Sequence, residues 1–465
     1  MELHLHGATA CVAKCDALGY DMNISGIPVV LPNRVTKPPC GPVVVQGMGG
    51  LSGVQILDYK IPGNVPDGTD GCPSQCGLQI EIRARVPNPA AFGLAIGTLN
   101  GQIEDAHGRA VGTISTHGLT LAPGNNTITM SGKLKPATRQ GLDALSAFMS
   151  TYLQQKSQKT TVRGIDAGES TVIWLQKVVD GIELSTAFPG AMKDFQIMTD
   201  IRLVSMNMIF SNKSGPPMVG AIVQANLGMP PQCDMSIVKD VTKAGMSFDM
   251  VYEGDVAGGL NLTKEAPVDY QNGQITVAFQ LTPMTIREDK MHVMQSLIKD
   301  LLTHPSKVMQ MRGTSAPQVV SNAGTLQLVD IPFQGETTMY GFNNFLSPRT
   351  QAPLMSIDKI DVVGGEAGIL HLAVDFQITN PSNVAPSMGQ VTMELWATSG
   401  FKIGDVTVDD FSLTANQHRN STTKFTSVPA RYISPTASSD AAHAGRLFLS
   451  TFVSHGAQEA QVRGT

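Results

Sequence analysis

Charged side chains are scarce in this 465-residue sequence: Asp, Glu, Lys and Arg together make up 15% of it, against about 25% in an average soluble protein. The formal net charge is −5, so no basic field exists to hold nucleic acid, and a DNA- or RNA-binding role is disfavoured. No run of about 18 apolar residues occurs, and the N-terminal MELHLHGATACVAKC lacks the basic-then-apolar pattern of a signal peptide. Taken alone, these absences indicate a soluble chain.

Aromatic residues are also few, at 5%, but hydrophobic residues in total reach 42% and supply enough apolar surface for packed cores. The 46 glycines and 28 prolines are spread along the chain and provide frequent turns. Many short strands separated by such turns are typical of all-β proteins. At about 150 residues per domain, the length suggests about three domains.

Three segments, ATRQGLDALSAFMSTYLQQ, EDKMHVMQSLIKDLL and SDAAHAGRLFLSTFVSH, have apolar residues on one face of a helix. The residues on these faces are Leu142, Leu145, Phe148, Met149 and Leu153; Met291, Met294, Leu297, Ile298, Leu301 and Leu302; and Phe448, Leu449, Phe452 and Val453. A polar link and an Arg-Gly pair follow each segment, at Arg163-Gly164, Arg312-Gly313 and Arg463-Gly464. We predict that each segment is a helix packed on a sheet.

The strands around these helices also repeat. LQIEIRARVPNP, from Leu78, aligns with LHLAVDFQITNP, from Leu370, and both alternate with the period of a strand. This alignment matches Asn88-Pro89 with Asn380-Pro381, which we expect at strand ends because Pro cannot donate to a central ladder. After the first two Arg-Gly pairs, IDAGESTVIWLQKVV and TSAPQVVSNAGTLQLV are interpreted as returning strands that complete a sheet. TVIWLQKVVDGIELSTAF and TLQLVDIPFQGETTMYGF are interpreted as alternating strands on either side of Val179-Asp180 and Val329-Asp330.

The repeats predict a mainly β fold of tandem sandwiches, at residues 44–190, 195–345 and 350–465, each with one packed helix. Residues 1–43 would be the tail of a preceding repeat with a Cys-bearing insertion. Gly7 precedes Ile27-Pro28 at nearly the spacing at which Gly313 precedes Ile331-Pro332. The sequence therefore begins and ends at the same point of the repeat. We therefore expect an internal piece of a longer repeat protein, with a truncated third repeat whose sheet keeps an unpaired edge.

The cysteines are concentrated near the N-terminus, and only Cys233 stands apart from the others. The candidates for disulfides that staple loops are Cys11, Cys15, Cys40, Cys72 and Cys76. Two alternatives stay open: free buried thiols, and a zinc site that also uses His4 and His6, because thiolate and imidazole suit tetrahedral zinc. The sequence does not reveal which cysteines pair.

Five sequons for N-glycosylation occur, at Asn23, Asn125, Asn212, Asn261 and Asn420. Asn125 and Asn420 are in turn-like segments at matching positions of the repeat. This placement favours a lumenal or extracellular chain, although the same residues are also ordinary polar turn residues.

A strand that ends in Asn-Pro, the hairpin LTLAPGNNTITMSGKL, an amphipathic helix, and a strand closed by GFNNF (Gly341–Phe345) together resemble the DUF3712 family. These are large fungal vacuolar or endomembrane proteins, related in fold to the LEA2 domains of plants. The resemblance covers about residues 44–465. It implies immunoglobulin- or fibronectin-like (LEA2-like) sandwich modules that face a lumen, usually behind one transmembrane helix. No catalytic residues are known for the family, so none are carried over.

The sequence contains no HExxH, P-loop or EF-hand pattern, and QGMGGLSGVQ lacks the third glycine of a dinucleotide-binding loop. We therefore predict no catalytic, cofactor-binding or metal-binding residues and no cofactor. The first functional interpretation is a non-enzymatic, lumenal or extracellular repeat region of a membrane-anchored endomembrane (vacuolar-type) protein. Its role would be structural or that of an adaptor, through exposed sheet edges that bind other proteins.

Two other functions stay open. The modules could bind a lipid or another apolar ligand under a helix, with Met291 and Met294 as a soft lid. The chain could also be an enzyme of an unrecognised type. Filled cores would favour the structural role, a cavity of some hundreds of Å³ would favour ligand binding, and clustered carboxylates or histidines in a cleft would favour catalysis.

Overall fold

The computed structural model describes residues 2–5, 12–15, 20–23, 43–46, 53–90, 93–168, 176, 179–180, 182–193, 195–210, 215–342, 355–397, 400–414, 421–433, 439–455 and 460–464. Strands dominate these residues and form β-sandwich-like modules with few helices, so the predicted mainly β fold is confirmed. The chain divides into two compact units. Unit 1 consists of Met1–Ile197, Gly228–Thr242 and Ala316–Ile331, and unit 2 of Met198–Leu227, Lys243–Ser315 and Pro332–Thr465.

Four short strands form two antiparallel pairs near the N-terminus. β1 (Glu2–Leu5) pairs with β4 (Val43–Gln46), and β2 (Val12–Cys15) pairs with β3 (Tyr20–Asn23). β1, β2 and β3 lie within residues 1–43, predicted to be the tail of a preceding repeat, whereas β4 continues to Gln46, inside the predicted first repeat.

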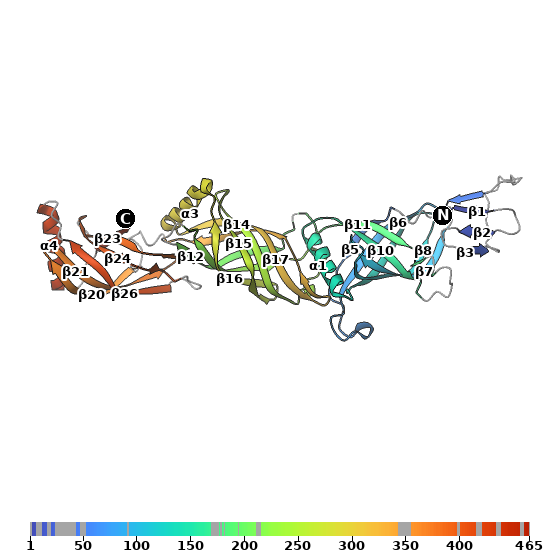
Figure 1. Ribbon diagram of the computed structural model, residues 1–465, viewed down its shortest axis with the longest axis horizontal. Helices are drawn as coiled ribbons and strands as arrows, with labels where there is room; N and C mark the ends of the chain where they lie inside the picture. The colour runs from blue at the N-terminus through green and yellow to red at the C-terminus, as the bar shows by residue number, and fades with distance from the viewer. Residues whose placement is uncertain are drawn as a thin grey trace. The chain divides into compact units, whose positions relative to one another are not determined.

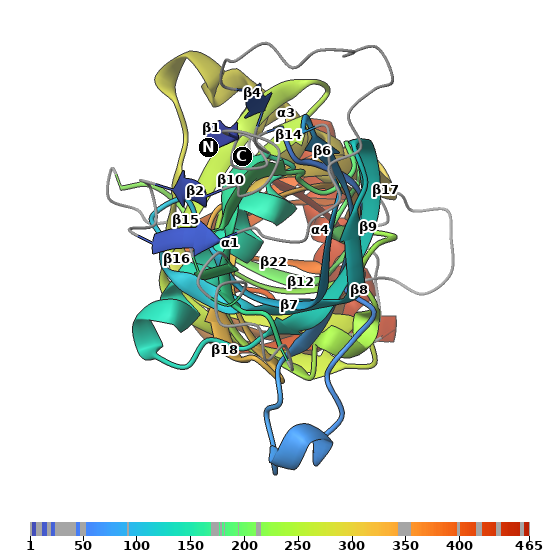
Figure 2. The ribbon, with the colours of Figure 1, turned by 90° about the vertical axis from the view of Figure 1, so that its right-hand side faces the viewer.

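The first large sheet has seven strands in the order β11-β10-β7-β8-β9-β6-β5 (Figures 1 and 2). Their bounds are β5 (Gln55–Lys60), β6 (Leu78–Asn88), β7 (Leu94–Glu104), β8 (Ala110–Leu121), β9 (Gly124–Leu134), β10 (Gln158–Asp166) and β11 (Glu183–Phe188). Helix α1 (Arg139–Leu153) connects β9 to β10, and a short 3-10 turn, η2 (Thr69–Gly71), lies between β5 and β6. Figure 2 shows β7, β8, β9 and β6 following one another around the curved sheet.

The second sheet is built from the next part of the chain. Its strands are β12 (Met198–Phe210), β13 (Met218–Leu227), β14 (Asp240–Tyr252), β15 (Asp255–Gln271), β16 (Gln274–Thr285), β17 (Ser306–Ser321), β18 (Gly324–Gln327) and β19 (Ile331–Tyr340). Helix α3 (Met291–Thr303) lies between β16 and β17, and two 3-10 turns, η3 (Met235–Ile237) and η4 (Glu288–Lys290), lie in the connections. β17 pairs with both β18 and β19.

The third group contains β20 (Met355–Glu366), β21 (Ile369–Asn380), β22 (Val384–Met388), β23 (Val391–Ala397), β24 (Lys402–Val408), β25 (Phe411–Ser412), β26 (Ser421–Ile433) and β27 (Ala460–Gly464). Helix α4 (Ser439–His455) precedes β27. β22 and β25 join the second sheet, where β22 runs parallel to β12. The other strands form a six-stranded sheet.

The same strand order occurs in three groups, with seven strands in the first two and six described strands in the third, and we call these groups modules 1, 2 and 3. The order β11-β10-β7-β8-β9-β6-β5 in module 1 corresponds to β19-β17-β14-β15-β16-β13-β12 in module 2 and to β27-β23-β24-β26-β21-β20 in module 3. Helices α1, α3 and α4 come directly before β10, β17 and β27 in the chain, which are equivalent strands of the three modules. The repeat limits 44–190, 195–345 and 350–465 remain a prediction, and the compact units divide the chain differently, because two segments of module 2 belong to unit 1.

The alternating sequence explains why these segments form strands with one buried face. In β6, Leu78, Ile80, Ile82 and Ala84 are all at most 5% exposed, whereas the polar residues between them face solvent. Successive side chains of a strand point to opposite faces, so a period-2 pattern buries one whole face against the facing strands.

The helices pack as predicted, with corrections at three positions. In α1, Thr138 caps the first turn, because its hydroxyl accepts a hydrogen bond from the Gly141 amide. In α3 and α4, however, Met291, Leu302 and Val453 are exposed, the last at 82%, although the apolar stripes predict that all three face a core. Residues at the edge of an apolar stripe are buried only when another element covers that flank. In the part of the chain that the structure describes, no helix is long and apolar enough to cross a membrane.

The structure also corrects the position of the returning strands. Arg163-Gly164 and Arg312-Gly313 lie inside β10 and β17, so both strands begin several residues before the Arg-Gly pair rather than after it. The predicted strand after Gly164 is wrong at Gln176 and Val179, which are helical, and its residues 169–175 and 177–178 lie outside the described residues. A short apolar run does not by itself distinguish a strand from a turn of helix.

Candidate functional site

The strand-end asparagines occupy the same kind of turn in modules 1 and 3. Asn88 ends β6 and Asn380 ends β21, and both are fully buried. Each side-chain oxygen accepts a hydrogen bond from the amide two residues on, Ala90 N at 3.0 Å and Ser382 N at 2.9 Å. Asn380 Nδ2 also donates to the carbonyls of Val384 and Thr414. These contacts fix the course of the backbone where each strand ends, which is a structural role.

The Arg-Gly pairs bring neighbouring backbones together. Arg163 bridges two glutamates, with Nε 3.0 Å from Glu104 and Nη1 2.7 Å from Glu183. A Cβ added to Gly164 would overlap the Val179 carbonyl, and one added to Gly313 would overlap the Ser247 carbonyl. Glycine is required at both positions for close packing. Arg463 and Gly464 lie in β27, which pairs with β23.

The described residues include some of the cysteines and some of the sequon asparagines. Cys72 and Cys76 form a disulfide, and Cys233 is free and buried. Cys11, Cys40, Asn212 and Asn420 lie outside the described residues, and Cys15 and Asn23 end β2 and β3. Asn125 and Asn261 are exposed, in β9 and β15. Within the described part of the chain, no group of three or more His, Cys, Asp or Glu side chains could hold a metal ion.

A polar contact within unit 1 joins module 1 to the β17–β18 hairpin of module 2. Asn322, at the tip of this hairpin, is 3% exposed. Its Nδ2 donates to the Val65 carbonyl at 3.0 Å, its backbone N donates to Asn64 Oδ1 at 3.1 Å, and its carbonyl accepts from Gly77 N at 2.9 Å. Asn322 thus binds both ends of the loop that contains the Cys72–Cys76 disulfide.

Helix α1 holds the next part of the same hairpin through two serines. Ser146 Oγ accepts from Gln327 N at 3.2 Å, and Ser150 Oγ accepts from Val329 N at 3.1 Å. Gln154 Nε2 donates to the Val329 carbonyl at 3.0 Å. These helix residues are four apart and therefore lie on one face. The hairpin of one module is in this way hydrogen-bonded to the helix of the preceding module.

A third contact in unit 1 is buried and contains the free cysteine. Ile61 forms an isolated parallel bridge with Cys233, and the Tyr152 hydroxyl lies 3.5 Å from Cys233 Sγ. Burial raises the pKa of the Cys233 thiol to about 11, and burial also raises the pKa of Tyr152. Both groups are therefore neutral at physiological pH. The thiol is a packing group and not a reactive nucleophile.

A cluster of titratable groups lies at the end of α3. The Tyr252 hydroxyl donates to Asp300, and Lys307 Nζ is 3.0 Å from the same carboxylate. These two contacts lower the pKa of Asp300. They tie the last turn of α3 to β14 and β17, and none of the three residues lines either of the two cavities described next. The cluster therefore has a structural role.

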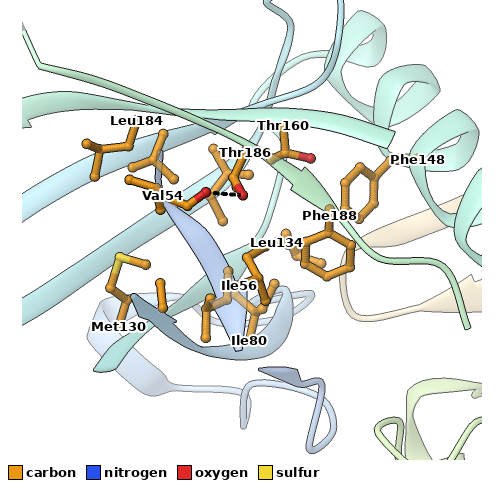
Figure 3. Close-up of a pocket in the computed structure, with 14 residues that line it drawn as sticks. Val54, Ile56, Ile80, Met130, Leu134, Phe148, Thr160, Leu184, Thr186 and Phe188 are labelled. Atoms are coloured by element: carbon orange, nitrogen blue, oxygen red, sulfur yellow. Dashed lines mark hydrogen bonds between the residues drawn. The ribbon is translucent and has the colours of Figure 1, made fainter. Parts of the chain in front are cut away.

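Two small apolar cavities lie inside the modules. The one in module 1 has a volume of about 20 Å³ and is lined by Val54, Ile56, Phe148, Leu184 and other mainly apolar side chains (Figure 3). The one in module 2, beside Met246 and Phe333, is about 10 Å³. A volume of this size holds at most about one water molecule. Neither cavity has room for a lipid chain.

One stretch of the chain matches a known family. Residues 256–395 match the DUF3712 family, described as a protein family of unknown function. This segment runs from β15 to β23 and contains one strand for every position of a module, together with α3. No curated protein matches the chain. A crystal structure of a Salmonella alpha-2-macroglobulin mutant aligns over 94% of this chain with 10% identity and a TM-score of 0.16, and the chain spans 28% of that protein's length. At this score the likeness carries no argument.

Several contact residues were not predicted from the sequence. Ser146, Ser150 and Asn322 were not proposed, although the serine spacing and the polar turn SNAG were visible. Apart from the turn itself, their partners belong to a different module and are remote in the chain, and periodicity reports only local structure.

Proposed function

We propose that this chain is a non-enzymatic repeat region with a structural or adaptor role, in which each module is tied to the next. The observation that carries the proposal is the docking of the β17–β18 hairpin on α1 and on the disulfide loop. Asn322, Ser146 and Ser150 make these bonds with backbone groups. Polar contacts of this kind between segments far apart in the chain fix one arrangement of those segments. They offer no nucleophile and no acid–base pair.

The proposed location is lumenal or extracellular, on a membrane-anchored protein of the endomembrane or vacuolar type. Two features support it. The Cys72–Cys76 disulfide is of a kind that persists in oxidising compartments. The sequon residues Asn125 and Asn261 are exposed and accessible to a glycosyltransferase.

Mapping of the glycosylation sites and the disulfide in the protein purified from its source tests this location. We expect glycan on Asn125 or Asn261 and an intact Cys72–Cys76 disulfide in samples alkylated at lysis. Unmodified asparagines together with two alkylated thiols would contradict a lumenal location. Intact disulfide without glycan would still indicate an oxidising compartment.

The alternative role, binding of a lipid or another apolar ligand, would use the cavity beside Phe148 of α1. Its lining is apolar apart from Thr160 and Thr186. A lipid chain would require the cavity to grow from about 20 Å³ to several hundred Å³. Native mass spectrometry of the chain incubated with mixed lipid vesicles distinguishes the two roles, since a stoichiometric adduct would support ligand binding.

A further inference from the structure

The Cys72–Cys76 disulfide closes a short ring in the loop between β5 and β6. Its two cysteines are four positions apart in the sequence. In Figures 1 and 2 this loop projects beyond the strands of module 1. A disulfide stabilises a fold mainly by constraining the unfolded chain, and this effect is smaller for short rings than for long ones. A ring of this size is therefore a weak staple for the module as a whole.

The ring also holds part of its backbone in an unfavourable conformation. Gln75 has a φ of 51°, in the left-handed region that residues other than glycine rarely adopt. Gly71 and Gly77, on either side of the ring, have φ values of 74° and 104°, which glycine adopts readily. An opened ring would allow Gln75 to leave the left-handed region, so the backbone conformation favours reduction of the disulfide.

The two sulfur atoms differ in their access to solvent. Cys72 is partly exposed, whereas Cys76 is 1% exposed. Lys135, directly after β9, places its Nζ 3.0 Å from Cys72 Sγ. An ammonium group attracts an incoming thiolate and stabilises the thiolate form of the sulfur that it contacts. Both access and charge therefore direct attack by an external thiolate to Cys72.

Acceptors for the two thiols of an opened ring are already in place. Cys72 Sγ lies 3.1 Å from the Ser74 carbonyl oxygen, and Cys76 Sγ lies 3.0 Å from the Cys72 carbonyl oxygen. A thiol is a weak hydrogen-bond donor, so each cysteine would donate to its carbonyl once it is reduced. Reduction would then leave no buried thiol without a partner, and the two sulfurs would stay close enough for the ring to close again.

The ring is directly followed by a residue that binds module 2. Gly77 N, adjacent to Cys76, donates to the Asn322 carbonyl at 2.9 Å, and the Gly77 carbonyl accepts from Val65 N at 2.9 Å. Asn322 Nδ2 in turn donates to the Val65 carbonyl. The position of Gly77 therefore links the state of the disulfide to the docking of the β17–β18 hairpin.

We propose that Cys72 is a thiol-exchange site, at which the dithiol of a thiol–disulfide oxidoreductase opens the ring and loosens the hairpin. The first thiolate of the reductant attacks Cys72 Sγ and forms a mixed disulfide, and Cys76 leaves as a thiolate that takes up a proton. The second thiolate of the reductant then attacks its own bound sulfur, and Cys72 leaves as a thiolate beside Lys135. The reductant is oxidised to a disulfide, and the two cysteines are reduced.

The inference adds regulation to the proposed structural role and rests on that role. The contacts between modules 2 and 3 provide an internal control, because the sequence has no cysteine after Cys233. In these contacts, Asn383 Nδ2 donates to the Leu203 carbonyl at 2.9 Å, and Asn383 Oδ1 accepts from Tyr340 N at 2.9 Å. Reduction should loosen the contact at Gly77 and leave the contacts of Asn383 unchanged.

Reduction of the oxidised 465-residue chain by dithiothreitol, followed by alkylation and peptide mapping, tests the site. We expect Lys135→Gln to slow reduction of Cys72–Cys76 roughly threefold or more, because one unit charge close to the reacting sulfur has an effect of this order in water. Lys159→Gln, at an exposed lysine of β10, makes the same change in net charge and should not slow reduction. With glutathione, a monothiol, the mixed disulfide should form on Cys72.

Hydrogen exchange measures the effect of reduction on the hairpin. In the reduced chain we expect faster exchange at 61–80 and 316–331, and recovery after reoxidation. Exchange at 110–134, in the sheet of module 1, and at 203–210, beside Asn383, should be unchanged.

Two sets of results would overturn the proposal. Equal reduction rates for the two lysine variants, a glutathione adduct on Cys76, or no reduction until exchange at 110–134 also becomes faster would overturn the exchange site. Unchanged exchange at 316–331 in the reduced chain would overturn its effect on the hairpin. If Asn322→Ala still loosens the hairpin in that case, the structural role stands without this regulation.

Discussion

Replacement of Asn322 tests the contact between the hairpin and the disulfide loop. Asn322→Ala removes the 3.0 Å bond from Nδ2 to the Val65 carbonyl but keeps the two backbone bonds. A lost hydrogen bond costs about 1 kcal/mol, and a buried carbonyl left without a partner adds about 1–3 kcal/mol. Among the described residues, no group donates a hydrogen bond to Asn322 Oδ1, so loss of this buried oxygen offsets part of the cost. From these magnitudes, the expected loss of local stability is roughly 1–2 kcal/mol.

The matched substitution is Asn322→Asp, which has nearly the same shape. It places a carboxylate oxygen against the Val65 carbonyl, where the amide donated, in a site that is 3% exposed. Burial of an unpaired charge is much more costly than loss of a neutral donor. We therefore expect Asp to be worse than Ala, and a larger gap above pH 5 than at pH 3, where the carboxyl group is protonated.

Native-state hydrogen exchange is the assay, because a chain of several modules need not unfold in a single step. Faster exchange is expected in residues 61–80 and 316–331, with little change at 274–285. An aspartate variant as stable as the alanine variant would refute the reasoning, since Val65 would then not depend on a donor. Equally faster exchange in the module 2 strands that are remote from the hairpin would also refute the reasoning.

Two further predictions concern packing and charge. Gly313→Ala should lower the midpoint of thermal unfolding sharply, because the added Cβ would overlap the Ser247 carbonyl. Gly364→Ala is the control and should leave the midpoint nearly unchanged, because the nearest atom to its added Cβ is 3.9 Å away. Equal midpoints for the two variants would show that β14 can move aside. The pKa of Asp300 is lowered by the Tyr252 hydroxyl and then by Lys307, so its contribution to stability is present above the unfolded pKa of about 3.9 and is lost as pH falls through the folded pKa. Thermal melts from pH 2 to 7 should therefore show a smaller acid loss in Asp300→Asn than in the native chain, and parallel curves would contradict this.

The repeats could be predicted from the sequence because they depend on the local periodicity of apolar residues. Alternation in LQIEIRAR predicts a strand with one buried face, and β6 has that pattern of burial. The helical stripes predicted α1, α3 and α4, since an apolar face must pack on something. The same locality explains the errors at Met291 and Val453, because a stripe does not reveal how wide the covering surface is.

By itself, the sequence determined which segments become strands and helices and where glycine and asparagine mark the repeat, since these follow from side-chain spacing and backbone conformation. Only the tertiary structure decided that Asn322 inserts into the loop at Val65 and that α1 holds the hairpin through Ser146 and Ser150. The tertiary structure likewise placed β27 and β20 at the two ends of the last sheet. These outcomes depend on contacts between residues far apart in the chain, whose hydrogen-bonding groups are common to all sequences and leave no periodic signal.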